Sequence, residues 1–190
     1  LSYADMQRRA ISDALVNGVF VLTGGPGTGK TTIVKALIDI FESMGLRVAL
    51  AAPTGRAAKR MSEATGREAK TVHRLLEMEF GDESGDRFRR NEQDPLEENV
   101  IIVDEASMLD SSLTGCLLRA IKPGARLLLI GDADQLPSVG AGNVLADIIE
   151  SGRFATVRLN EIFRQAGASL IVTNAHAINE GRMPELGIKN

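Results

Sequence analysis

The sequence is poor in several residue types, and each shortage excludes a class of protein. Its single cysteine, Cys116, excludes an internal disulfide and a cysteine-rich metal site, and it suits a reducing cytoplasm. The two histidines, His73 and His176, lie far apart with no cysteine partners, so no zinc site is expected. No apolar run approaches the roughly 20 residues that span a bilayer, and no signal peptide is recognisable. We therefore expect no membrane partner.

Excess charge is also lacking. The formal net charge of −3 argues against a polycation for duplex DNA, although it leaves room for a local cationic groove. Hydrophobic residues make up 44% of the chain and charged residues 25%, as in ordinary soluble globular proteins. A length of 190 residues suits one α/β domain with room for a small insertion.

A glycine-rich run follows the first apolar segment of the chain. Val19–Thr23 predicts a buried strand, and apolar residues at helical spacing from Ile33 to Phe41 predict a helix after the run. A strand–loop–helix setting is the one that a Gly-x-x-x-x-Gly-Lys-Thr motif requires. The run that fulfils it reads Gly24-Gly25-Pro26-Gly27-Thr28-Gly29-Lys30-Thr31-Thr32.

This pattern is typical of a phosphate-binding loop. Its glycines let backbone N–H groups surround phosphate oxygens, and the N-terminus of the following helix adds positive potential. Lys30 then reaches the outer phosphates, and Thr31 supplies a hydroxyl ligand for Mg²⁺. The sequence therefore predicts that the chain binds a nucleoside triphosphate.

Two carboxylates follow the next clearly buried segment. Val100–Val103 predicts a strand, and Asp104 and Glu105 come directly after it. The carboxyl ends of parallel strands are where open α/β sheets bind ligands. We expect Asp104 to hold Mg²⁺ and Glu105 to polarise the attacking water as a general base. The alternative is that this pair simply caps the next helix.

Other residues are weaker candidates. Gln135 follows the end of a predicted strand, so it could contact the γ-phosphate or its water, and the alternative is loop hydrogen bonding. Arg164 lies near another sheet end, where a cation could stabilise the transferring phosphoryl group, and by itself it would be taken for a surface arginine. Further strands are expected at Arg47–Ala52, Arg126–Ile130 and Ala155–Leu159, and helices at Tyr3–Asn17, Arg56–Ala64, Asp110–Ile121, Asn143–Ser151 and Ala168–Asn179.

Two polar stretches leave alternatives open. Arg56, Lys59 and Arg60 crowd the start of a predicted helix, where cations oppose the helix dipole. They indicate either a phosphate ligand or a solvated charged face. Residues 77–99 are polar, with apolar–polar alternation on both sides of a Gly/Asp/Ser tip. They predict a small inserted β-hairpin or, alternatively, a disordered acidic loop.

Together these stretches resemble a known family, the superfamily-one DNA helicases of the RecD-like group, the α-subunit type of exodeoxyribonuclease V. The resemblance implies a P-loop NTPase of α/β class with a RecA-like parallel sheet and helices on both faces. It also implies that the Arg126–Ile130 strand lies between the phosphate-loop strand and the Val100–Val103 strand. The matching blocks occur in family order from Gln7 to Gln165: Gly24–Thr31, Ala52–Ala58, Thr71–Leu75, Val103–Met108, Gly131–Pro137 and Ile162–Gln165.

The resemblance further implies roles for single residues. Gln7 corresponds to a glutamine that reads the adenine of ATP, and Phe163 to an aromatic residue that stacks near the base. Gln135 and Arg164 match positions that sense the γ-phosphate. Residues 77–99 fall where relatives insert the pin that splits duplex DNA. The residues implied to bind single-stranded DNA are Pro53, Thr54, Arg56, Thr71 and His73.

Residues 1–190 are accordingly expected to be the first motor domain of a larger helicase, because the family carries a second motor domain that completes the ATP site. The implied function is Mg–ATP hydrolysis that drives 5′ to 3′ translocation and duplex unwinding in recombination or repair. Implied partners are DNA, the second motor domain and other recombination-nuclease subunits, in the bacterial cytoplasm at the nucleoid. The isolated domain is expected to be weakly active. The alternative is a nucleotide-dependent DNA-binding or switch module within a recombination nuclease complex.

Overall fold

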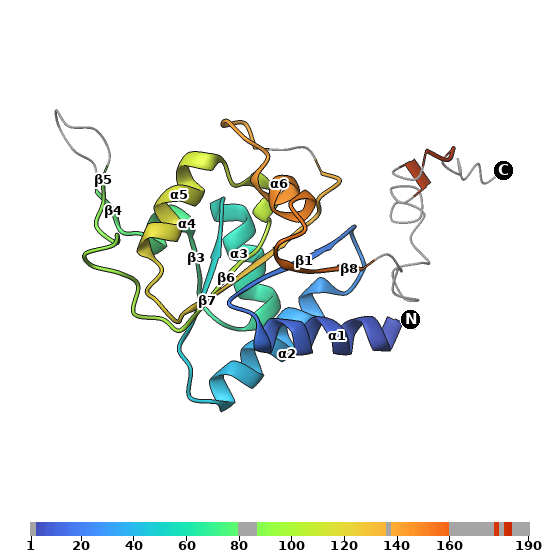
Figure 1. Ribbon diagram of the computed structural model, residues 1–190, viewed down its shortest axis with the longest axis horizontal. Coiled ribbons are helices and arrows are strands. Elements are labelled where there is room, and N and C mark those ends of the chain that lie inside the picture. Colours follow the sequence, from blue (N-terminus) through green and yellow to red (C-terminus); the bar gives the residue numbers. More distant parts are fainter. Residues whose placement is uncertain (1–2, 80–86, 136–137, 160–176, 179–180, 184–190) are drawn as a thin grey trace.

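A six-stranded parallel sheet forms the centre of the computed structural model, which describes residues 3–79, 87–135, 138–159, 177–178 and 181–183 (Figure 1). The strands lie in the order β3-β2-β6-β7-β1-β8, and all neighbours run parallel. This order places β7 between β1 and β6 and confirms the RecA-like arrangement that the resemblance implied. The strands are β1 (Val19–Gly24), β2 (Val48–Ala52), β3 (Ala69–Thr71), β6 (Val100–Val103), β7 (Arg126–Gly131) and β8 (Ala155–Leu159), and a separate pair comprises β4 (Met78–Glu79) and β5 (Arg87–Phe88).

Helices cover both faces of the sheet (Figure 1). Side chains from α1, α2 and α3 pack into the core on one face, and side chains from α4, α5 and α6 pack into the core on the other. No helix in the described ranges is both long and apolar enough to cross a bilayer. The helices are α1 (Tyr3–Val16), α2 (Lys30–Ser43), α3 (Gly55–Thr65), α4 (Val72–Leu75), a 3₁₀ turn η1 (Ala106–Met108), α5 (Ser111–Ala120) and α6 (Val144–Glu150).

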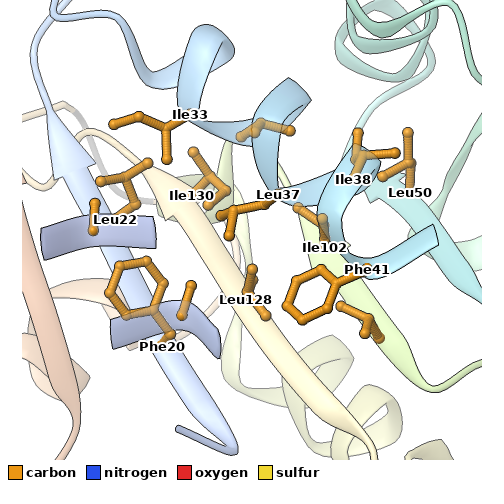
Figure 2. Packing of buried hydrophobic residues seen from close by; sticks show 14 of the residues in the cluster. Phe20, Leu22, Ile33, Leu37, Ile38, Phe41, Leu50, Ile102, Leu128 and Ile130 are labelled. Atoms are coloured by element: carbon orange, nitrogen blue, oxygen red, sulfur yellow. The ribbon is translucent and has the colours of Figure 1, made fainter. Parts of the chain in front are cut away.

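The central strands are buried on both faces, and their side chains alternate between the two cores. Phe20 and Leu128 point into the first core together with Phe41 of α2, and Leu128 lies between the two phenylalanine rings (Figure 2). Val21 and Leu129, one position further along the same strands, belong to the second core. Each of these fully buried side chains contributes about 1.5–3 kcal/mol relative to leaving it exposed. The continuous apolar runs of β1, β6 and β7 thus reflect burial from two sides.

Most predicted strands and helices that the structure describes are observed to within a residue of their expected bounds. The exceptions are α2, which extends beyond the apolar Ile33–Phe41 stretch to Lys30–Ser43, and the hairpin, whose two strands are short. Asp110 caps α5 as expected, because its Oδ1 accepts a hydrogen bond from the N–H of Leu113 at 2.7 Å. The edge strand β3 (Ala69–Thr71) was not predicted. Its three half-buried residues lack apolar alternation, and pairing with β2 defines it. The helix expected at Ala168–Asn179 lies outside the described residues apart from two positions.

The antiparallel pairing predicted within residues 77–99 is present, and β4 and β5 stand away from the main sheet in Figure 1. The tip of this hairpin is not among the described residues. An ion pair holds its base, where the guanidinium of Arg90 lies 2.8 Å from the carboxylate of Glu77. The ring of Phe88 lies 5.9 Å from the ring of His73 in α4. The hairpin base is therefore attached to α4.

Candidate nucleotide site and nucleic-acid groove

The phosphate loop connects the end of β1 to the start of α2. Gly27 and Gly29 have φ angles of 75° and 80°, a left-handed conformation that residues with a β-carbon rarely adopt. Between them Thr28 is fully buried, and its hydroxyl donates a hydrogen bond to the carbonyl of Gly25 at 2.8 Å. The loop is thus tightly wrapped beside the first turn of α2, and the N-terminus of a helix favours an anion.

Lys30 is the first residue of α2. Its ammonium group donates hydrogen bonds to carbonyl oxygens of the phosphate loop, including that of Gly25 at 2.8 Å. Burial lowers the pKa of Lys30, while the carboxylates of Asp132, Asp104 and Glu105 act in the opposite direction. A partly desolvated ammonium group beside an anion-favouring helix start gains from a bound phosphate.

The carboxylates of Asp104 and Glu105 follow β6. The Oδ1 of Asp104 accepts a hydrogen bond from the N–H of Glu105 at 2.8 Å. Burial raises the pKa of Asp104, because its charged form loses hydration there. Glu105 has φ 54° and ψ 37°, again in the left-handed region. Its Oε1 accepts a hydrogen bond from Nη2 of Arg60 at 2.9 Å.

One cavity of about 320 Å³ brings these groups together. Its walls include the side chains predicted to be catalytic that the structure describes, namely Lys30, Asp104, Glu105 and Gln135, together with Thr31 and Pro26 of the phosphate loop. The sheet order explains this meeting. Because β1, β7 and β6 are neighbours and run parallel, the loops that follow them lie at the same edge of the sheet.

The residues of the cavity fit a magnesium-bound triphosphate. Within the described ranges no group of three or more His, Cys, Asp or Glu side chains could hold a metal by itself. The hydroxyl of Thr31 and the carboxylate of Asp104 are oxygen donors, which Mg²⁺ prefers, and phosphates and water complete its shell in nucleotide sites. A cation beside Asp104 would also favour the charged form that burial disfavours.

The loop after β7 contributes a carboxylate that the sequence analysis did not single out. Asp132 is only 5% exposed. Its charge raises the pKa of Lys30 more than the charges of the two predicted carboxylates do. The N–H of Gln135 donates to the carbonyl of Asp132 at 3.2 Å, which folds the loop back beside the cavity. The signal for Asp132 was present, because it directly follows a buried strand just as Asp104 does.

A second, open hollow lies next to the cavity, with a volume of about 740 Å³. We call it the groove. Three of the five predicted DNA-binding residues line it, namely Pro53, Thr54 and His73, and so does Gln135. Its other walls are formed by Met108, Asp110, Leu113, Ser138, Val139 and Gly140. Gln135 is therefore shared between the cavity and the groove.

Two of the predicted DNA-binding threonines have structural roles as well. The hydroxyl of Thr54 caps α3 by accepting from the N–H of Ala57 at 3.2 Å. The hydroxyl of Thr71 caps α4 by accepting from the N–H of Arg74 at 3.1 Å. Thr71 and the exposed Arg56 are not among the residues that line the groove.

Four residues predicted to take part in the nucleotide site do not line the cavity in the described part of the structure. Gln7 lies half-buried in α1 and does not line the cavity. Thr32 is exposed in the first turn of α2. Phe163 and Arg164 lie outside the described residues. The roles of these four residues stay predictions.

The fold and the site together define a P-loop domain that binds nucleoside triphosphates on a RecA-like sheet. The chain belongs to the family described as the AAA domain, whose model matches residues 2–189. It is 48% identical to the ATP-dependent RecD2 DNA helicase of Deinococcus radiodurans, over 89% of this chain and 23% of that protein. It is 45% identical to the RecBCD enzyme subunit RecD of Mycobacterium tuberculosis, over 93% of this chain and 34% of the relative. The resemblance to RecD-like helicases is confirmed.

Two solved structures share the fold. The Pif1 helicase of Candida albicans superimposes with a TM-score of 0.64 at 26% identity, over 97% of this chain and 45% of that one. Bacteroides sp Pif1 in complex with ADP-AlF4 gives a TM-score of 0.59 at 26% identity, over 87% and 43%. The chain thus spans less than half the length of each of these structures and of the two curated relatives above.

Proposed function

We propose that this chain is the first motor domain of an ATP-dependent DNA helicase, and that it hydrolyses Mg–ATP to move along single-stranded DNA. The observation that carries the proposal is the position of Gln135. It lines the cavity with Lys30 and Glu105 and also the groove with His73. A side chain that touches both compartments can respond to the γ-phosphate and bias a strand held in the groove. The relatives named as DNA helicases support the same function.

Five residues of the cavity have defined parts in the proposed hydrolysis. Lys30 neutralises charge on the outer phosphates. Glu105 accepts a proton from the attacking water, and Gln135 orients that water against the γ-phosphate. Mg²⁺, held by Thr31 and Asp104, supplies further charge neutralisation on the phosphate oxygens when it is bound. The site is then completed by Gln7 on the adenine, Phe163 beside the base and Arg164 on the transferring phosphoryl group.

The groove is proposed to hold the sugar–phosphate backbone of a single strand. Pro53, Thr54 and His73 form its contact surface, and Thr71 and Arg56 extend that surface along α4 and α3. Contacts to backbone rather than base edges give binding that tolerates any sequence and weakens with salt. The hairpin within residues 77–99 is proposed to act as a pin at the duplex junction, because its base is attached to α4 beside His73.

The remaining assignments concern the longer protein that the relatives indicate. We propose that a second motor domain closes over the cavity, that translocation runs 5′ to 3′, and that the protein acts in recombination or repair at the bacterial nucleoid. The name of the RecBCD relative supports other nuclease subunits as partners. Because closure supplies part of the transition-state charge, residues 1–190 alone are expected to turn over ATP slowly.

Titration with a fluorescent ATP analogue and a labelled single strand tests the proposal. Lys30→Ala should weaken nucleotide binding at least about tenfold, while the strand still binds. Glu105→Gln should bind both ligands but lose about 100-fold or more in hydrolysis. A wild-type rate for Glu105→Gln would contradict the proposed base. Nucleotide-dependent DNA binding without any hydrolysis would favour the switch module instead.

A further inference from the structure

An ion pair connects α3 to the candidate general base. Nη2 of Arg60 lies 2.9 Å from Oε1 of Glu105, although the two residues are 45 positions apart in the sequence. The side chain of Glu105 is 25% exposed and that of Arg60 is 62% exposed. Both side chains line the cavity that holds Lys30. The contact therefore lies inside the proposed reaction site and is not a remote surface pair.

We propose that Arg60 is a positioning residue for ATP hydrolysis, which fixes the carboxylate of Glu105 for the attacking water. This inference rests on the proposed function. The guanidinium engages Oε1, so Oε2 is the oxygen that takes the proton from water. Arg60 itself contacts neither phosphate nor water in this scheme, and it acts only through Glu105.

The need for such a residue follows from the chemistry of a glutamate base. Its side chain has several rotatable bonds, and a partly exposed carboxylate samples orientations of which few face the water. A misplacement of about 1 Å in a reacting group can cost up to about 100-fold in rate. The backbone of Glu105 is already held in a left-handed conformation, with its N–H bonded to Asp104. Arg60 is the partner that orients the far end of the same side chain.

A matched pair of arginine variants isolates this role. Arg60→Gln removes the proposed contact, whereas Arg67→Gln removes an arginine–glutamate pair of the same kind, at 2.8 Å from Glu42 and away from the cavity. Steady-state hydrolysis of radiolabelled ATP is measured over a range of ATP concentrations with saturating single-stranded DNA, and circular dichroism checks that each variant is folded. Arg60→Gln should lower kcat about tenfold and change the KM for ATP less than about twofold. Arg67→Gln should leave both constants unchanged.

Two further variants separate positioning from a purely structural effect. Arg60→Lys should recover part of the lost rate, because it keeps a cation near the carboxylate. In a Glu105→Gln background, Arg60→Gln should change the residual rate less than about twofold, because the group through which it acts is gone. An additive loss in that background, a raised KM with unchanged kcat, or a wild-type rate for Arg60→Gln would overturn the proposal. Failure of the wild-type chain to hydrolyse ATP would instead contradict the proposed function itself.

Discussion

Glu105, the proposed general base, has an unfavourable backbone conformation. Its φ of 54° places a residue with a long side chain in the left-handed region, at a cost of about 1–2 kcal/mol. Strain of this kind accumulates at functional sites, where the surrounding structure holds it in place. The position fits, because the turn after β6 directs the side chain into the cavity. The left-handed backbone of Glu105 therefore lowers the stability of the fold but places the carboxylate in the cavity.

Comparison of two neutral substitutions should expose this strain. Glu105→Gln and Glu105→Asn both remove the charge and the ion pair with Arg60, but asparagine tolerates the left-handed region better than glutamine. We expect Glu105→Asn to unfold with a free energy about 0.5–1 kcal/mol higher than that of Glu105→Gln. Urea denaturation at neutral pH measures the difference. Equal stabilities would mean that the backbone at this residue is not strained.

The sequence predicts the parts of the site that are local in the chain. The phosphate loop is recognisable because strand, glycines, Lys30 and helix lie within one short segment. Arg60 was instead grouped with neighbouring cations as either phosphate-binding or solvated, since nothing near it in sequence indicates a carboxylate partner. Its contact with Glu105 arises only when β2 and β6 become neighbours in the sheet. The function of a charged residue depends on what the topology places beside it.

The helix α3 runs from the groove to the cavity. Its cap, Thr54, lines the groove, and Arg60 lies in its second turn beside Glu105. A movement of the start of α3 would therefore also move Arg60, which contacts the proposed general base. The hydroxyl of Thr54 serves the helix itself, because it satisfies the N–H of Ala57.

Two substitutions of Thr54 should separate the effect of losing its capping hydroxyl from the effect of losing its methyl group. Thr54→Ala deletes the hydroxyl and is expected to lower the free energy of unfolding by about 1 kcal/mol. Thr54→Ser keeps an acceptor for the Ala57 N–H and should remain close to wild type. Urea denaturation compares the two variants. An unchanged stability in Thr54→Ala would argue that the cap is not formed in solution.

The end of α2 is tied to the segment after α3 by a bidentate ion pair between Glu42 and Arg67, with contacts at 2.8 and 3.1 Å. This hydrogen bonding holds the pKa of Glu42 below its ordinary value. A carboxyl group whose pKa is lowered by folding stabilises the protein above its unfolded pKa, about 4.3. The contribution is lost as the pH falls through the lower folded value.

The lowered pKa of Glu42 predicts how the stability of a Glu42→Gln variant depends on pH. The variant is expected to have a lower urea midpoint than wild type at pH 7, and the two midpoints should converge in acid. High salt should narrow the difference, because the pair is exposed to solvent. Glu63→Gln breaks the looser 3.9 Å pair with Lys59 and should shift the midpoint less. A constant difference across the pH range would exclude the ion pair as its source.

The strands and helices with strong apolar patterns were predicted from the sequence. The strand that is defined only by pairing with a neighbouring strand was not. The strands β1, β6 and β7 are continuous apolar runs and are visible in the sequence. The strand β3 (Ala69–Thr71) has no such pattern, and its existence depends on the edge of β2. The hairpin was left open between two interpretations, because its polar sequence has little apolar area to bury.

The stability of the whole molecule depends most on the centre of the sheet. Leu128 is fully buried in β7, and Leu118 on α5 is 51% exposed. Leu128→Ala is expected to cost about 2–5 kcal/mol, a large part of the roughly 5–15 kcal/mol that stabilises a typical domain. Leu118→Ala should cost less than about 1 kcal/mol. Thermal unfolding by calorimetry compares them, and similar losses would mean that β7 is not the centre of the core.

The strand order also has a consequence for synthesis of the protein on the ribosome. The strand β1 is translated about 100 residues before either of its sheet neighbours, β7 and β8. Until β7 and β8 leave the ribosome, the apolar strand β1 lacks its sheet neighbours, stays exposed and is prone to aggregate. The phosphate loop is therefore translated well before the strands that complete its surroundings, and the nascent segment is expected to need a chaperone during that interval.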